Sequence, residues 1–399
     1  MKYDFDRRID RKSTNDLKWH AQAVTSYLHC EIPENMIPMW LADTDFACAP
    51  FIVDKIKQRA DKEIFGYCAP MGEFYKAVCY WEKSRFDFTV EPSWITYLPS
   101  VVAGINIAIR AFTREGDGVI IQQPVYDPFA SIVKNSGRKV VNNGILVSDG
   151  KFSMNFEELE QLAAEESNKL MVLCSPHNPI GRVWSREELM RVADICVRNN
   201  VMLVSDEIHA DIVYEGHTHI PLLNLNDTCK DKFILLTAPG KTFNIAGLKA
   251  AISIIPNEDI RKKFVKMQTD MSLDVKNTFG IEATAAAYTP EGEEWVAEEV
   301  AYMQKNVAFV EDYVKENMPQ VSMIRPEGTF LCWLDLTGLH LGDKEIMKRV
   351  LFDAAVICVP GDWFGPGGEE HLRINIGCPQ SMLKEALDRI TEALYKEQA

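Results

Sequence analysis

The chain has 399 residues, of which 47% are hydrophobic and 25% charged, a balance typical of a globular protein with a large core. Its formal net charge of −15 argues against nucleic acid and anionic membranes as partners. No apolar run approaches the roughly 18 residues of a membrane helix, and the first residues carry no apolar signal core. Ten cysteines without a Cys-x-x-Cys pair favour reduced thiols, so we expect a cytoplasmic protein.

The N-terminal part of the chain alternates polar, turn-rich stretches with short apolar ones. Residues 1–36 are polar with one amphipathic piece, which predicts an arm. The apolar segment 37–46 ends in acidic residues and predicts a strand that runs into a loop. A helix is expected over 50–61, and the turn 65–67 after it exposes Tyr67.

A small-residue turn next leads into an apolar helix. The pattern predicts a strand over 94–98, a turn over 99–104 and a helix over 105–112. The start of a helix has free backbone N–H groups and the positive end of the helix dipole, which together suit a phosphate. The sequence therefore indicates a weak candidate phosphate site in this turn.

The middle of the chain predicts a parallel sheet with helices on both faces, because near-continuous apolar runs alternate with helical stretches. Four side chains capable of chemistry fall at or just after the C-terminal ends of the expected strands: Tyr126, Asn178, Asp206 and Lys241. Ligands of α/β folds bind at this edge of the sheet, so we expect one shared site. The further expected strands are 119–121, 140–141, 170–174, 201–205, 233–236 and 250–255.

The pattern changes from Trp295 onwards. Apolar residues at alternating spacings of four and three, up to Val314, predict one long amphipathic helix. Three short apolar runs and a terminal amphipathic helix follow, which suits a smaller α/β domain. We predict three units: an N-terminal arm with part of the small domain (1–45), a large domain (46–290) and a small C-terminal domain (291–399).

Lys241 lies between small residues in a turn directly after the apolar run 233–236. A lysine amine that is desolvated at such a place is suited to forming a Schiff base. The alternative is an ordinary surface lysine in a turn, and the turn alone favours that alternative.

Four dispersed motifs change this assessment. They are Ser175-Pro176-His177-Asn178-Pro179 with Gly181-Arg182, Ser205-Asp206-Glu207-Ile208-His209, Gly240-Lys241-Thr242-Phe243-Asn244 and Leu372-Arg373-Ile374-Asn375. In order and spacing, and over nearly the whole chain, this set resembles the fold-type I pyridoxal-phosphate enzymes. The resemblance implies an α/β fold with a mostly parallel seven-stranded sheet between helices in a large domain, plus a smaller α/β domain.

A closer resemblance lies in the segment Met39-Trp40, Ala42-Asp43 and Asp45-Phe46, together with the motifs around Asp206 and Lys241. Within the superfamily these look like the MalY/PatB group of cystathionine β-lyases and related C–S lyases. The resemblance implies pyridoxal 5′-phosphate as the cofactor and an amino acid as the substrate. It also implies a homodimer whose active site is shared between subunits.

The resemblance further implies roles for single residues. Lys241 would hold the cofactor aldehyde and move the Cα proton of the substrate. Asp206 would keep the pyridine nitrogen protonated, Asn178 would donate to the ring 3-oxygen and Tyr126 would lie on the ring face. The alternatives for these three are an N-cap, an Asx-turn and a core tyrosine.

At the phosphate end, the resemblance assigns the backbone N–H groups of Val102 and Ala103, with help from Thr237. Tyr67 would reach the phosphate of the neighbouring subunit, and we count it among the catalytic residues. Gly240 departs from the family, in which a serine is expected before the lysine, and this departure weakens the expected phosphate contacts.

At the substrate end, Arg373 would bind the α-carboxylate, with a surface salt bridge as the alternative. Ala42 is assigned to the substrate site, and His209 is expected near the cofactor 3-oxygen. A metal site built from His209, His217 and His219 is the rival interpretation. Their spacing is not that of a zinc motif, so we expect no metal.

The function implied is a C–S β-lyase that converts cystathionine or related cysteine S-conjugates to thiol, pyruvate and ammonia. An aminotransferase acting on an amino acid and a 2-oxo acid is the alternative, because both reactions begin with the same proton removal. A non-catalytic regulator on the same fold is a weaker alternative, since Lys241 and Asp206 are both present. The core motifs do not separate lyase from aminotransferase; only the closer resemblance favours the lyase.

Overall fold

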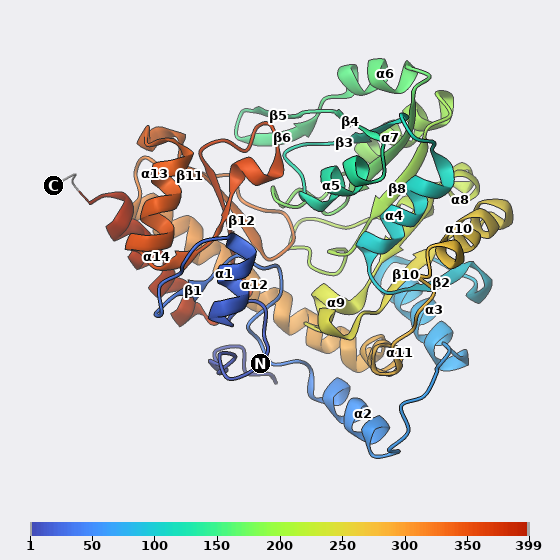
Figure 1. Cartoon of the computed structure of the whole chain (residues 1–399), viewed down its shortest axis with the longest axis horizontal. Helices are drawn as coiled ribbons and strands as arrows, with labels where there is room; N and C mark the ends of the chain where they lie inside the picture. The colour runs from blue at the N-terminus through green and yellow to red at the C-terminus, as the bar shows by residue number, and fades with distance from the viewer. Residues whose placement is uncertain (1, 397–399) are drawn as a thin grey trace.

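A computed structural model describes residues 2–396, and a seven-stranded sheet forms its centre (Figure 1). Strand β10 is antiparallel to both of its neighbours, and all other pairs are parallel, which confirms the expected mostly parallel sheet. In order across the sheet, the strands are β2 (Ile95–Leu98), β10 (Ala251–Ile254), β9 (Ile234–Thr237), β8 (Met202–Asp206), β7 (Asn168–Cys174), β3 (Gly118–Ile121) and β4 (Lys139–Asn142).

Both faces of this sheet are buried, and alternate residues of one strand belong to different cores. In β7, Leu170 and Val172 pack with helices α4 (Val101–Phe112), α5 (Pro128–Asn135) and α10 (Glu258–Asp270). Their neighbours Met171 and Leu173 pack on the other side with helices α6 (Phe156–Ala164) and α7 (Arg186–Arg198). Continuous apolar runs are therefore required, which is why the strands were recognisable in the sequence.

The C-terminal part builds a second, antiparallel sheet. Its strands, in order, are β11 (Ser322–Met323), β12 (Leu331–Asp335), β15 (His371–Asn375) and β14 (Val359–Pro360). The helices of this part are α12 (Pro290–Asn317), α13 (Gly342–Lys348) and α14 (Gln380–Leu394). The short apolar run 356–359 divides between two strands, because β13 (Val356–Ile357) lies outside this sheet and pairs in parallel with β1 (Ile37–Pro38). The N-terminal segment is thereby joined to the C-terminal part.

The remaining elements lie around these two sheets (Figure 1). Among residues 2–396, no helix combines the length and apolarity needed to cross a bilayer. The elements that surround the two sheets are α1 (Ala21–Leu28), α2 (Pro50–Ala60), α3 (Gly72–Phe86), α8 (Asp227–Lys232), α9 (Pro239–Thr242), α11 (Thr278–Ala287) and the hairpin of β5 (Ile145–Ser148) and β6 (Lys151–Met154).

Local signals at the first residues account for where several helices begin. The predicted start of a helix at 105 is wrong: α4 begins at Val101, because the Ser100 hydroxyl accepts the N–H of Ala103 at 3.1 Å. Lys241 lies in the one-turn helix α9 rather than in an open turn, with Pro239 at its first position. A capping box formed by Ser185 and Glu188 begins α7.

Gly181 fixes the loop between β7 and α7 against the segment that precedes β12. Its φ is +68°, and its carbonyl accepts the N–H groups of Glu327 and Gly328 at 2.9 and 3.0 Å. A Cβ added there would lie 2.5 Å from the Cβ of Pro326. We expect Gly181→Ala to lower the free energy of unfolding by about 1–3 kcal/mol for the overlap, in addition to the cost of the backbone conformation.

Gly216→Ala is the matched control, because Gly216 has a φ of +90° but nothing within 4 Å of the added Cβ. It isolates the backbone cost of about 1 kcal/mol. Urea unfolding of both variants measures the difference. Equal losses would show that the contact with Pro326 does not constrain the loop.

Candidate active site

A cavity of about 370 Å³ lies at the carboxyl edge of the central sheet. It is formed where the segments after several parallel strands meet the start of α4 and the N-terminal segment around Ala42. The topology thus brings most of the predicted site residues together. Those that line the cavity are Ala42, Val102, Tyr126, Asn178, Asp206, His209 and Lys241.

Lys241 opens onto this cavity, and protein atoms otherwise enclose its amine. The amine donates a hydrogen bond to the carbonyl oxygen of Ala42. Burial lowers the pKa of Lys241 to about 8, although Asp43 and Asp206 oppose the shift. A substantial fraction of the amine is therefore unprotonated and nucleophilic near neutral pH, unlike that of a surface lysine.

Asp206 is the last residue of β8 and is buried. Its Oδ1 accepts the N–H of Ile208 at 3.1 Å, but a turn and not a helix follows, so the N-cap alternative is wrong. Burial raises the pKa of its carboxyl group to about 7, while the Lys241 cation opposes that shift. A carboxyl group that lines a cavity in this state is suited to pairing with a basic ring nitrogen.

Arg373 is buried on β15, so its surface-salt-bridge alternative is wrong. Its guanidinium donates to Asn178 Oδ1 at 3.1 Å and to the Trp40 carbonyl at 2.6 Å, and it lies 5.1 Å from the centre of the Phe364 ring. Its Nε has no partner within residues 2–396. A buried cation with an unused donor is suited to an anionic ligand such as a carboxylate.

The bond from Arg373 also determines what Asn178 offers. Because Asn178 Oδ1 is already an acceptor, the free part of this side chain is its NH₂ group, which is a donor. Tyr126 is linked to the same loop through its backbone N–H, which donates to the Asn178 carbonyl at 3.1 Å. Tyr126 is half-buried and lines the cavity, unlike a core tyrosine.

The anion end of the cavity differs from the expectation in detail. Ala103 does not line it, since the N–H of this residue is used by the cap of α4. Thr237 is buried, and its hydroxyl points to the Glu207 carbonyl at 3.5 Å. The cavity instead meets the start of α4 at Ser100 and Val101.

Lys249 also lines this cavity and adds a positive charge. The sequence reading missed Ser100, although a serine directly before an apolar helix is the usual signal of an N-cap. Lys249 carried no comparable signal.

Tyr67 lies outside the cavity. It is fully exposed on the segment that connects α2 to α3 at the rim of the molecule (Figure 1). Ile64, Phe65 and Met71 on the same segment are also exposed. Within one chain, Tyr67 therefore contributes nothing to the site.

The three histidines have separate environments. His209 is buried beside the Phe330 ring, and burial lowers its pKa to about 3, so it is neutral. His219 lies 2.8 Å from Glu207, and His217 is exposed. In the described part of the chain, no group of three or more His, Cys, Asp or Glu residues is placed to hold a metal ion.

The donor set fits pyridoxal 5′-phosphate. The aldehyde of this cofactor needs an amine, which the enclosed Lys241 provides. Its ring nitrogen needs a carboxyl group as a partner, which buried Asp206 provides. A helix start and the nearby Lys249 meet the requirement of its phosphate.

Comparison with known proteins agrees with this fit. The profile of the family described as aminotransferase class I and II matches residues 39–390. Cystathionine β-lyase PatB of Bacillus subtilis is 39% identical over 391 residues, which cover 98% of this chain and 100% of that protein. Protein MalY of Escherichia coli is 30% identical over 394 residues, with 98% and 99% covered. The crystal structure of cystalysin from Treponema denticola, which contains pyridoxal 5′-phosphate, has a TM-score of 0.95 at 36% identity and full coverage of both chains.

The raised pKa of Asp206 predicts how the stability of the cofactor-free chain depends on pH. The folded chain binds this proton more tightly than the unfolded chain, whose Asp206 has a pKa near 3.8. The resulting stability is present at low pH and is lost as the pH rises towards 7. Asp206→Asn, which cannot ionise, should gain roughly 2–3 kcal/mol relative to the parent between pH 5 and pH 8.

Urea unfolding of cofactor-free protein at the two pH values measures this gain. Asp149→Asn, in an exposed turn, is the control and should track the parent. A difference between Asp206→Asn and the parent that stays constant with pH would contradict the assignment of a buried, protonated Asp206.

Proposed function

The chain belongs to the class I and II aminotransferase family, and we propose that it is a pyridoxal-phosphate-dependent C–S β-lyase. Its proposed substrate is cystathionine or a related cysteine S-conjugate, and its products are thiol, pyruvate and ammonia. The observation that carries this function is the enclosed Lys241 amine, which lies in one site with buried Asp206 and near buried Arg373. The similarity to PatB over the whole chain supports the choice of reaction.

When bound, the cofactor supplies an aldehyde and an electron sink for the bonds at the substrate Cα. The neutral amine of Lys241 is the base that takes the Cα proton, and its pKa near 8 suits that step. The Ala42 carbonyl holds this amine in place. The carboxylate of Asp206 would keep a proton on the ring nitrogen, and the NH₂ group of Asn178 would donate to the ring 3-oxygen.

Arg373 orients the substrate. Two of its nitrogens are fixed by Asn178 and Trp40, so the guanidinium is held rigidly for the α-carboxylate. The start of α4 and Lys249 would hold the phosphate of the cofactor, and Tyr126 would lie against its ring. With its α-carboxylate bound by Arg373, the substrate presents its Cα to Lys241, whose buried surroundings exclude water from the amine.

The site is completed by a second copy of the chain. The exposed segment with Ile64, Phe65, Tyr67 and Met71 is an apolar surface that a partner subunit covers. Tyr67 then reaches the phosphate end of the partner's cavity. This arrangement accounts for a tyrosine that contributes nothing to its own cavity.

Two further assignments belong to this proposal. All ten cysteines are free thiols, which supports a reducing, cytoplasmic location. The division into 1–45, 46–290 and 291–399 is supported by the two separate sheets and by the β1–β13 pair, which joins the N-terminal segment to the C-terminal part.

The first functional test mixes purified protein with L-cystathionine and assays pyruvate, with a parallel mixture containing 2-oxoglutarate assayed for glutamate. We expect pyruvate without any 2-oxo acid. Lys241→Ala should reduce pyruvate formation by about 10²–10⁴-fold or more, because both the cofactor linkage and the base are lost.

Glutamate without pyruvate would contradict the lyase assignment and make the protein an aminotransferase. Cofactor binding without either product would favour a non-catalytic regulator. Asp149→Asn again provides a control with an unchanged site.

The shared site predicts complementation between two inactive variants. Lys241→Ala and Tyr67→Ala each damage one component, and a mixed dimer contains one cavity with both components intact. After subunit exchange at equal concentrations, activity should return to about a quarter of the parent's, since half of the dimers are mixed and each has one intact site. Failure to recover activity, with exchange verified by mass spectrometry, would contradict a site shared through Tyr67.

A further inference from the structure

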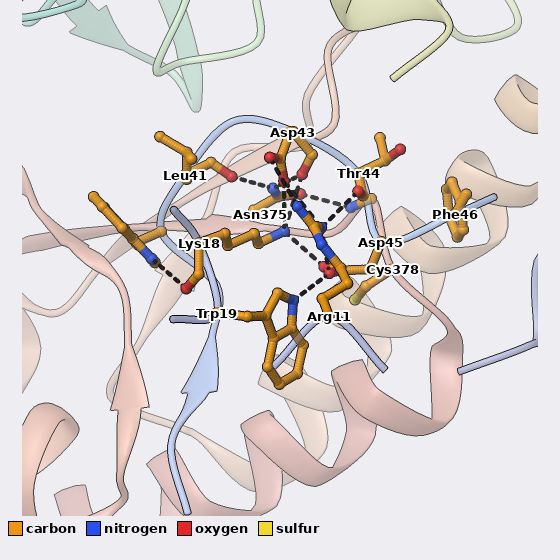
Figure 2. A network of polar contacts seen from close by, with 12 residues as sticks. Arg11, Lys18, Trp19, Leu41, Asp43, Thr44, Asp45, Phe46, Asn375 and Cys378 are labelled. Atoms are coloured by element: carbon orange, nitrogen blue, oxygen red, sulfur yellow. Dashed lines mark hydrogen bonds and ion pairs between the residues drawn. The ribbon is translucent and has the colours of Figure 1, made fainter. Parts of the chain in front are cut away.

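The segment Trp40–Phe46, whose Ala42 lines the cavity, contains no helix or strand, and side chains bind several of its carbonyl groups (Figure 2). Five consecutive carbonyl groups, from Trp40 to Thr44, each accept a hydrogen bond from a side chain. In that order, one donor to each carbonyl is Arg373 (2.6 Å), Asn375 (2.6 Å), Lys241, Lys18 (2.9 Å) and Arg11 (3.0 Å). Asn375 also donates to the Asp43 carbonyl at 2.6 Å, and Asn244 to the Thr44 carbonyl at 2.9 Å. We call this segment the strap.

The donors come from three distant parts of the chain. Arg373 and Asn375 belong to β15, Lys241 to α9, and Arg11 and Lys18 to the N-terminal arm. The two donors nearest the chemistry, Lys241 and Arg373, are thus bonded to carbonyls only two residues apart. Any displacement of the strap moves the contacts of both.

The arm holds the strap through a buried cluster of charges, which Figure 2 shows. Lys18 lies 2.6 Å from Asp45, and Arg11 lies 2.7 Å from Asp45 and 3.0 Å from Asp43. Trp19 donates its indole N–H to Asp45 at 2.7 Å. Lys18 and Asp45 are 1% and 5% exposed, so both ions have lost their water.

Such a cluster contributes little to the free energy of unfolding, because the desolvation of buried ions cancels much of their mutual attraction. Burial opposes the charge on Lys18, but Asp45 and Asp43 hold its pKa above the ordinary value. Burial likewise opposes the charge on Asp43, but Lys18 and Arg11 hold its pKa below the usual range. Lys18 and Asp43 therefore both favour their charged forms, next to a lysine whose reactivity depends on charge.

We propose that the arm cluster of Arg11, Lys18, Asp43 and Asp45 is a positioning device for Lys241. The cluster holds the strap so that the Ala42 carbonyl accepts a hydrogen bond from the Lys241 amine. It also holds the carboxylate of Asp43 in place, so that its negative charge acts on the same amine. The proposal rests on the proposed function only in taking Lys241 as the reactive amine. Asp43 acts through Lys241 and is a positioning residue rather than a catalytic one.

Charges from every side act on this amine. Burial lowers the pKa of Lys241, Asp43 on the strap and Asp206 on β8 raise it, and Arg373 on β15 lowers it. From the arm, Lys18 also lowers it. His209 is neutral and adds no charge. Among the charged groups, Asp43 has the largest effect on the pKa of Lys241, so the strap contributes to the protonation of the amine beside the sheets.

Competitive acetylation of the cofactor-free protein tests this directly. Acetic anhydride labels only unprotonated amines, and mass spectrometry across pH 6–10 reads the pKa of Lys241 itself. Asp43→Asn, which retains the shape of the side chain, should lower that pKa by about one unit. Asp43→Glu should keep it close to the parent value, because the charge remains.

Asp16→Asn is the matched control. Asp16 lies 2.6 Å from Arg11 on the arm, but it is not among the principal charges that act on Lys241. Its loss should leave the titration of Lys241 unchanged. A shift as large as that of Asp43→Asn, or no shift in Asp43→Asn with a native circular dichroism spectrum, would overturn the proposal.

Lys18→Met separates charge from loosening of the strap. Removal of this cation should raise the pKa of Lys241, opposite to Asp43→Asn, whereas a merely loosened strap would shift both variants in the same direction. If one variant fails to fold, the direction in which the other shifts the pKa of Lys241 still tests the proposal. The labelling reads the amine whether or not the enzyme turns over cystathionine, so failure of the proposed reaction and failure of this inference are distinguishable.

Discussion

An enclosed lysine amine is the constraint on which the site depends. Desolvation disfavours the charged form of Lys241, whereas the Ala42 carbonyl and the carboxylates of Asp43 and Asp206 stabilise it. The balance leaves the pKa near 8, low enough for a nucleophile and base near neutral pH. Holding that balance requires contributions from the arm, the strap and two strands of the central sheet.

The central sheet meets this requirement through its topology. Parallel strands that are buried on both faces end at one edge, and Asp206 and Lys241 follow neighbouring strands there. The second sheet contributes Arg373 from β15, and the N-terminal segment crosses between them. A β-lyase needs its base and its carboxylate anchor at a set separation, and one short strap bonded to both provides that separation.

Much of this was predictable from local signals. Lys241, Asp206, Asn178 and Tyr126 each follow an apolar strand, and their placement in one cavity follows from the rule for parallel sheets. The phosphate end was less predictable: Ala103 and Thr237 use their polar groups internally, while Ser100 and Lys249 face the cavity. Which of several adjacent groups turns towards a ligand depends on the cap of α4, whose start the apolar pattern placed four residues late.

The sequence by itself determined the class of fold and the family, and it selected Lys241 and Asp206 as members of one candidate site. Those features reside in periodicity and in motifs whose members lie close together along the chain. Only the tertiary structure decided that Arg11 and Lys18 are joined to Asp43 and Asp45, and through the strap to Lys241 and Arg373. Charges far apart in the sequence acquire a shared role only when folding removes the water between them, since water would otherwise screen their attraction.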